Sequence, residues 1–394
     1  MKIKFTFVLP LLAAAGLAGC GDGNGGGPLT ELSAAAALGA KIFADPSLSA
    51  SGRLSCTTCH DPGRAHASNA AVIAGGPNLT TPGFRNPPSL RYIDQTPAFA
   101  ITDDGALGGF DRDGRVASLA EQARQPLLAA HEMANISAVN FANRLQQAAY
   151  AAEFRQVFGN TVFDDPQTAL DRATFALQRY QLEDDEFHPY DSKYDAFLQG
   201  RAQLSAQELR GLQAFNDPQK GNCTACHPGN RGAGGSLPLF TDFHYDNLGV
   251  PRNDAIPATA DPAYYDLGLC GPDREDLKDR LELCGQFKTP TLRNIALTAP
   301  YFHNGRFATL REAVAFYVQR DTSPQFWYPL ADDGSVRKFN DVPGPTATGF
   351  DYRTIVNIEE VPYDRRLGEQ PRLTESEIDD VVAFLNTLND GYQP

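Results

Sequence analysis

The chain has 394 residues and a formal net charge of −14, with 34 Lys and Arg against 48 Asp and Glu. This acidic balance argues against binding to nucleic acid or to anionic lipid surfaces, which attract basic patches. The length predicts about two domains. Only 7 Cys, 2 Met and 1 Trp are present, so each of them can be considered as a candidate ligand or redox-active group.

Residues 1–19 are predicted to be a secretory signal. Lys2 and Lys4 flank an apolar run that is too short to span a membrane as a stable helix. Small residues then precede Cys20, a pattern similar to a bacterial lipobox. We therefore expect Cys20 to be lipidated and residues 20–28, which are rich in glycine, to form a flexible tether. An ordinary signal with an incidental cysteine is the alternative; both predict export to the periplasm, with membrane contact only through a lipid anchor.

Two C-x-x-C-H runs dominate the rest of the chain. With 7 Cys and 7 His in 394 residues, an accidental run is expected only roughly 0.002 times. In such a run both thiols form thioethers to one haem and the histidine binds its iron. A zinc site would require further paired ligands at matching spacing. The sequence thus predicts two haem c groups, held by Cys56, Cys59 and His60 and by Cys223, Cys226 and His227.

The chain nearly repeats itself before each of these runs. The segments Leu38-Gly39-Ala40-Lys41-Ile42-Phe43-Ala44-Asp45-Pro46 and Arg210-Gly211-Leu212-Gln213-Ala214-Phe215-Asn216-Asp217-Pro218 each predict an amphipathic helix that stops before Asp-Pro. This repeat predicts a mainly α fold with two cytochrome c-like haem domains in tandem, at residues 29–195 and 196–394.

Later helix starts are also marked in the sequence. Capping-box patterns begin at Ser118, Ser205, Thr309 and Thr374, and the last one opens a helix with one apolar face. A long Gly- and Pro-rich segment after the second motif is expected to form an extended loop over the haem. Cys270 and Cys284 lie in it, and in an oxidising compartment a disulfide between them is expected.

From about Leu38 to Leu388 the chain resembles the bacterial di-haem cytochrome c peroxidases, and within them the MauG branch. Besides the haem motifs, the resemblance rests on Arg85-Asn86-Pro87-Pro88-Ser89-Leu90, Asp113-Gly114-Arg115, Ser118-Leu119-Ala120-Glu121-Gln122-Ala123, His131-Glu132-Met133, Lys288-Thr289-Pro290-Thr291-Leu292-Arg293-Asn294 and Pro300-Tyr301-Phe302-His303-Asn304-Gly305. It implies a first-domain haem that meets hydrogen peroxide and a second-domain haem that stores or relays an electron.

The resemblance places Tyr317 as the distal ligand of the second haem, where classical peroxidases have Met and the MauG branch has Tyr. The residues alone allow another interpretation, because Leu310, Val314, Tyr317 and Val318 share one helix face and Tyr317 would then be part of the core. A phenolate ligand would favour ferric and higher-valent iron and lower the reduction potential.

The resemblance also assigns the catalytic pair of the first haem. Glu132 matches the family's distal acid and Gln122 its distal amide, and His131 is the rival proton carrier. The loop at residues 68–84 lacks the distal His of many classical members, and His66 is expected to pack beside the haem edge or to face solvent. The prediction is an open, high-spin first haem that needs no reductive activation.

Two further expectations come from the resemblance. The family holds a calcium ion between its haems, for which Asn86 would give a side-chain oxygen and Thr298 and Pro300 their carbonyls. Family members usually have Trp immediately before Asp-Gly-Arg, between the haems, but this chain has Arg112 there, and its only Trp is Trp327. This departure puts MauG-type radical chemistry in question.

The leading hypothesis is therefore an oxidoreductase of the cytochrome c peroxidase type, which reduces hydrogen peroxide with electrons from a small cytochrome c or cupredoxin. One alternative is MauG-like, peroxide-dependent oxidation of a residue in a partner protein. A third is a non-catalytic electron-transfer cytochrome with two six-coordinate haems. The sequence leaves the donor, the reduction potentials and the oligomeric state open.

Overall fold

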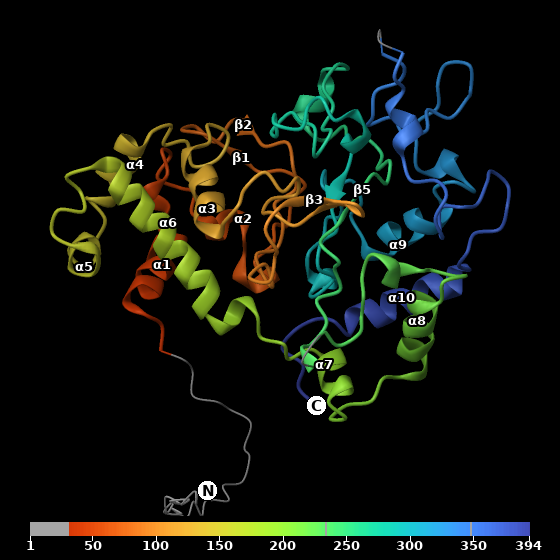
Figure 1. Cartoon of the computed structure of the whole chain (residues 1–394), viewed down its shortest axis with the longest axis horizontal. Helices are drawn as coiled ribbons and strands as arrows, with labels where there is room; N and C mark the ends of the chain where they lie inside the picture. The colour runs from red at the N-terminus through yellow and green to blue at the C-terminus, as the bar shows by residue number, and fades with distance from the viewer. Residues whose placement is uncertain (1–30, 233–234, 347–348) are drawn as a thin grey trace, which may run out of the picture. The chain divides into compact units, whose positions relative to one another are not determined.

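The computed structural model describes residues 31–232, 235–346 and 349–394. Residues 32–394 form one compact unit (Figure 1). The predicted signal, Cys20 and the tether lie outside the described residues. Within the described ranges, no helix combines the length and the apolar character that crossing a membrane would require.

The first half of the compact unit corresponds to the predicted domain that ends at residue 195, and the second half to the rest. The first half is built around two crossing helices, α1 (Ala34–Ala44) and α6 (Pro166–Glu183). Against α6 pack α3 (Leu119–Leu128) and α4 (Ala138–Leu145), and α5 (Ala151–Phe158) contacts α1. The short helix α2 (Cys56–Cys59) carries the first motif. The buried side chains between these helices form one apolar cluster, which includes Phe43, Phe141, Phe154, Leu170 and Leu177.

The second half repeats this arrangement with α8 (Ala206–Asn216) and α10 (Glu375–Asn386), which lie side by side in Figure 1. The helices α7 (Lys193–Leu198) and α9 (Leu310–Gln319) complete it. Its core is a separate cluster that includes Phe215, Phe240, Ile378, Phe384 and Leu385. The mainly α prediction is confirmed, whereas the domain boundary at residues 195 and 196 stays a prediction.

The predicted helix starts agree with the structure. Ser205, Thr309 and Thr374 each form a full capping box with the Glu three residues later, and Ser118 accepts a hydrogen bond from the Glu121 N–H. These contacts satisfy backbone N–H groups that the first helical turn leaves without partners.

Each copy of the sequence repeat has a glycine, Gly39 or Gly211, where its helix contacts the backbone of a second helix. A Cβ atom on Gly39 would lie 2.1 Å from the Ala176 carbonyl oxygen of α6, and one on Gly211 would lie 1.9 Å from the Asp380 carbonyl oxygen of α10. Only glycine lets these helix backbones approach so closely. In each half, the glycine thus allows the close crossing of two helices, one of which contacts the C-x-x-C-H motif.

We expect Gly211→Ala to destabilise the protein. Alanine would gain about 1 kcal/mol of helix propensity, but the clash with backbone atoms must push α8 and α10 apart, at a cost of about 3 kcal/mol. The net loss of about 2 kcal/mol should appear in a denaturant unfolding curve. Gln213→Ala, at an exposed position of the same helix, is the control and should change stability by less than about 0.5 kcal/mol. Equal stability of both variants would contradict the crossing argument.

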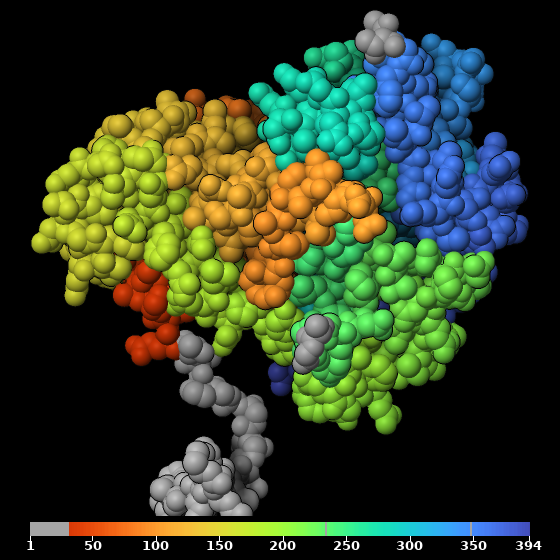
Figure 2. All heavy atoms as spheres, in the orientation of Figure 1, coloured from red at the N-terminus to blue at the C-terminus, as the bar shows by residue number. Residues whose placement is uncertain are grey.

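The described strands are short and form three antiparallel pairs. These are β1 (Ala74–Gly75) with β2 (Thr81–Pro82), β3 (Ala100–Thr102) with β4 (Gly105–Leu107), and β5 (Tyr245–Asp246) with β6 (Phe287–Lys288). A bridge between Leu107 and His244 links the β3–β4 hairpin to the second half. In Figure 2 the turquoise surface of the second half meets the orange surface of this region.

Buried ion pairs join the two halves. Arg85 donates two hydrogen bonds to Asp266, of 2.6 and 2.7 Å, and a third of 2.6 Å to Asp113. Near the C-terminus, Asp390 accepts hydrogen bonds from Arg91 and from the Tyr92 hydroxyl. Such pairs fix the halves against each other because separating them would leave charges buried without partners.

Candidate functional site

The first C-x-x-C-H run opens onto a cavity of about 280 Å³ in the first half. Its wall includes Cys56, Cys59 and His60. The polar groups in the same wall include Gln122, Glu132, His131, Arg115 and Asp111. The motif histidine and the predicted distal acid and amide therefore face one common space.

The ring of His60 is held by its backbone surroundings. Its Nδ1 lies 3.0 Å from the Pro88 carbonyl oxygen and 3.3 Å from that of His66. Carbonyl oxygens only accept, so Nδ1 carries the proton and the Nε2 lone pair is left for a metal. Burial lowers the pKa of His60 to about 4, which keeps the imidazole neutral and able to ligate.

The second run opens onto a larger cavity of about 320 Å³. Cys223, Cys226 and His227 line it, and His227 Nδ1 donates to the Phe240 carbonyl oxygen at 2.8 Å. The second motif thus repeats the local geometry of the first: two cysteines beside a neutral histidine, whose Nε2 is free.

These sites fit covalently bound haem. The cysteines of both motifs are free thiols, and burial raises the pKa of each to about 12. Within the described part of the chain, no group of three or more His, Cys, Asp or Glu is arranged to hold a metal ion. Each motif presents two thiols and one imidazole to its cavity.

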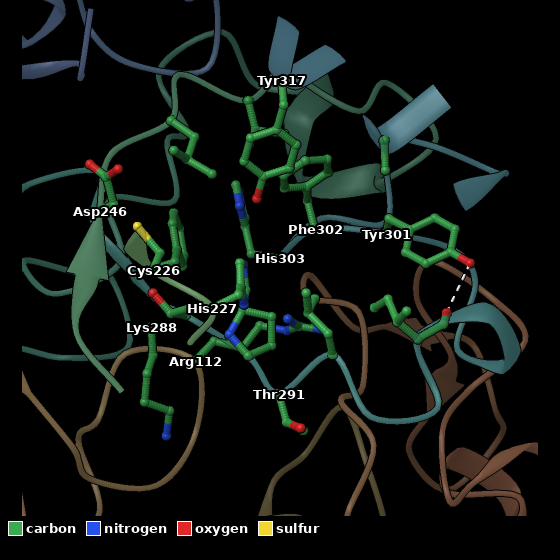
Figure 3. A pocket seen from close by; sticks show the side chains of 18 of the residues that line it. Arg112, Cys226, His227, Asp246, Lys288, Thr291, Tyr301, Phe302, His303 and Tyr317 are labelled. Carbon is green, nitrogen blue, oxygen red and sulfur yellow. Dashed lines mark hydrogen bonds between the residues drawn. The ribbon is translucent and has the colours of Figure 1, made fainter. Parts of the chain in front are cut away.

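Tyr317 projects from α9 into the second cavity. Figure 3 shows its hydroxyl directed into the cavity that Cys226 and His227 also line. Burial, and then the nearby motif cysteines, raise the pKa of the phenol. Its neighbours Val314 and Val318 belong to the core, so the helix face is apolar as the periodicity predicts, and this face, Tyr317 included, lines the cavity.

Glu132 is the titratable group that stands out in the first cavity. Burial raises its pKa to about 7, with Asp111 adding to the shift and Arg115 opposing it. Gln122 Nε2 donates to Asp111 at 3.2 Å, and Arg115 pairs with Asp111 at 3.2 Å. A carboxyl group near half protonation at neutral pH can both accept and release a proton.

His131 and His66 take different positions. His131 lines the first cavity and packs against the Phe84 ring, with ring centroids 4.8 Å apart. His66 is fully buried, stacks on Phe187 at 4.3 Å and is absent from the walls of both cavities. The expectation that His66 might face solvent is therefore wrong, because the aromatic cluster around it takes up the whole ring.

Arg112 lies in the wall that the two cavities share. Its guanidinium donates at 2.9 Å to both the backbone and the side-chain oxygen of Asn86. Thr298 and Pro300 line the second cavity with Asn86, so the predicted calcium ligands do gather there. As they lie here they do not fit calcium, because the only side-chain oxygen would have to leave a cationic partner. The calcium site stays a prediction.

The extended segment after the second motif contains the Cys270–Cys284 disulfide, with Cα atoms 5.0 Å apart. The same segment supplies Asp266, which pairs with Arg85, and Asp273, which lines the first cavity. Sequence reasoning missed Asp111, Arg115 and Asp273 as cavity residues. The Asp-Gly-Arg motif pointed towards Arg115, but no sequence signal connects Asp273 with a cavity in the other half.

Fold and site together define a c-type cytochrome with one covalent haem site in each half, and comparison with known proteins agrees. Residues 33–203 match the family described as di-haem cytochrome c peroxidase. The methylamine utilization protein MauG of Paracoccus denitrificans is 36% identical over 371 residues, which cover 92% of this chain and 90% of that protein. The cytochrome c551 peroxidase of Nitrosomonas europaea is 33% identical and covers 71% of each chain.

Solved structures show the same architecture. The crystal structure of the diheme peroxidase BthA from Burkholderia thailandensis matches with a TM-score of 0.81 and 40% identity, over 91% of this chain and 86% of that one. A MauG-like protein associated with microbial copper homeostasis matches with a TM-score of 0.61 and 27% identity, over 92% and 91%. The chain belongs to the di-haem cytochrome c peroxidase family, with two c-type haems in tandem cytochrome c-like halves.

Proposed function

We propose that this protein is an exported peroxidase that reduces hydrogen peroxide to water with electrons from a small periplasmic cytochrome c or cupredoxin. The observation that carries the proposal is Glu132, which faces the cavity of the first motif with a pKa raised to about 7. The acidic surface charge suits a basic donor. In this proposal the protein is held at the membrane only through lipidated Cys20.

Reduction of one hydrogen peroxide takes two protons and two electrons and gives two waters. Haem, when bound, supplies the iron that meets peroxide and exchanges electrons. Glu132 takes the proton from the near peroxide oxygen and delivers it to the departing one. Gln122, on the same wall, is fixed by its hydrogen bond to Asp111 and orients the peroxide.

The second cavity suits electron storage. His227 and Tyr317 line it from different elements and would both hold the iron of its haem, whereas the first cavity is lined by His60 and by the polar groups around Glu132. This asymmetry supports a peroxidatic first haem and an electron-transferring second haem. An electron-transfer cytochrome without catalysis would have no use for a proton-carrying carboxyl in the first cavity.

A second candidate function is peroxide-dependent oxidation of a residue in a partner protein. Tyr317 and the similarity to MauG favour it, and Arg112 in the shared wall weighs against close MauG-type coupling. Steady-state turnover with reduced cytochrome c or cupredoxin tests the first function. A mass change on a co-purifying protein after peroxide addition would support the second, and a first haem whose spectrum ignores peroxide would reject both.

Tyr317→Phe should change the second haem alone. Removing the hydroxyl removes the proposed ligand, while the ring still fills its place in the core. Electron paramagnetic resonance of the ferric wild type is expected to show one high-spin and one low-spin haem, and only the low-spin signal should change in the variant. Tyr363, buried with its ring centroid 6.0 Å from that of Tyr317, gives the control variant Tyr363→Phe, which should keep the signal. Two low-spin signals in the wild type would contradict an open first haem.

A further inference from the structure

A loop of the second half reaches the cavity of the first half. The Cys270–Cys284 disulfide closes this loop, and the Arg274 guanidinium anchors it. Arg274 donates to the Asp113 carbonyl oxygen at 2.8 Å and lies 3.8 Å from the centre of the Phe99 ring. The loop is therefore attached to the first half by a buried arginine and braced by a covalent bond.

This attachment brings Asp273 to the rim of the first cavity. The Asp273 carboxylate lies 3.6 Å from Arg85 and 3.7 Å from Arg115, and its side chain is 22% exposed. It lines the same cavity as Glu132. Asp273 is thus a partly exposed carboxylate that lines the cavity and lies close to two of its arginines.

The charges around the two carboxyl groups differ: acidic neighbours outnumber basic ones around Glu132, whereas the two are equal in number around Asp273. Glu132 faces Asp111 and Arg115 from the turn before α3 and Asp273 from the loop, and His131 lies beside it in the chain. Asp273 faces two arginines and two buried aspartates, Arg85, Arg115, Asp113 and Asp266. Burial raises the pKa of Asp273, and the arginines oppose that shift.

We propose that Asp273 is the residue through which Glu132 exchanges protons with solvent. The inference rests on the proposed peroxidase function. Each turnover consumes two protons, and both must reach Glu132, a half-buried carboxyl in the wall of the cavity. A partly exposed carboxylate on the rim can bind a proton from water and release it inward, and Arg85 and Arg115 hold it at that position. Asp273 acts through Glu132 and does not itself touch the peroxide.

Asp273→Asn is the test. With Glu132 intact, the steady-state rate of peroxide reduction with a reduced donor, which consumes the two solvent protons, should fall roughly tenfold, less than for loss of the proton carrier itself. A small acid that cannot ligate iron should restore the rate, so raising the phosphate buffer concentration should speed the variant and leave the wild type unchanged. Because Asp273 raises the pKa of Glu132, the midpoint of the remaining pH profile should also move to lower pH.

Two variants separate this role from a structural one. Glu275→Gln, at an exposed position two residues further along the loop, should leave both the rate and the buffer dependence unchanged. Asp273→Glu keeps the carboxyl group and should recover most of the rate. If Asp273→Asn only disturbed the structure, the rate would fall and a higher buffer concentration would not restore it.

The outcomes distinguish the inference from the proposed function. If the wild type reacts with peroxide and Asp273→Asn reacts at the same rate at every pH and buffer concentration, the proton-exchange role is overturned while the peroxidase stands. A slow Asp273→Asn variant that buffer does not rescue also overturns it. If the wild type itself does not react with peroxide, the proposed function has failed first.

Discussion

Glu132→Gln is expected to slow the reaction with hydrogen peroxide by about 10²- to 10⁴-fold, the range typical for loss of a positioned acid–base group. Glutamine keeps the size of the side chain and its place on the cavity wall but cannot accept the peroxide proton. Stopped-flow mixing of the ferric protein with peroxide measures the rate directly. His131→Gln is the comparison variant: if it has the larger effect, His131 and not Glu132 carries the proton.

The pH profile provides the second signature of Glu132. Its pKa is raised to about 7 chiefly by burial, then by Asp111, so the wild-type rate should fall as the pH drops through 7 and the carboxylate is protonated. Glu132→Gln should lose this limb. Because the folded pKa lies above the ordinary value, any stability from the protonated group is present in acid and is lost as the pH rises through 7. The variant should therefore be no less stable than the wild type above pH 7.

Arg293→Met is expected to destabilise the protein by about 3–5 kcal/mol, because it leaves the buried Asp195 carboxylate without its partner. Arg293 and Asp195 are 1% and 0% exposed and share two hydrogen bonds of 2.8 and 2.7 Å. The arginine also lies over the rings of Tyr92 and Tyr190, at 4.8 and 4.5 Å. The pair thus links the start of α7 to the segment that leads to the second cavity.

Thermal or denaturant unfolding measures this loss of stability. Two further variants test whether the buried, unpaired charge causes it. Adding Asp195→Asn to Arg293→Met removes the orphaned charge and should recover part of the stability. Arg311→Met breaks an exposed pair with Glu375, whose side chains are 45% and 67% exposed, and should cost less than about 1 kcal/mol. If both arginine variants lose the same stability, burial is not the cause.

The pH at which acid destabilises the protein should also change in Arg293→Met. Burial alone would raise the pKa of Asp195, but Arg293 and Ser192 hold it below its usual value. A depressed carboxyl pKa contributes stability above the unfolded value, which is lost as the pH falls through the folded value. This contribution therefore disappears only in strong acid, and Arg293→Met should shift that loss to higher pH.

Local patterns allowed the fold and the haem sites to be predicted from sequence. The C-x-x-C-H spacing, the capping boxes and the repeated helix act within a few residues, so they can be read without a structure. Tyr317 is a borderline case, because an apolar helix face and a cavity wall give the same periodicity. Only the cavity beside Cys226 separates the two.

Long-range contacts explain what the sequence did not show. Asp273 reaches the first cavity only because Arg274 attaches the loop to a carbonyl of the first half. From the sequence, Asn86 is predicted to be an oxygen ligand of calcium, but in the fold its side-chain oxygen accepts a hydrogen bond from Arg112. Neither pairing follows from a local pattern, since the first depends on contact between the two halves and the second on contact between two loops of the first half.

The contribution of the second half to the first cavity bears on how the protein matures. Arg85 and Asp266 are separated by 181 positions in the chain, and Asp273 follows later still. The first cavity therefore has its complete wall only when the second half has folded against the first. Formation of the Cys56, Cys59 and His60 site is a local event, whereas completion of its surroundings depends on the whole chain.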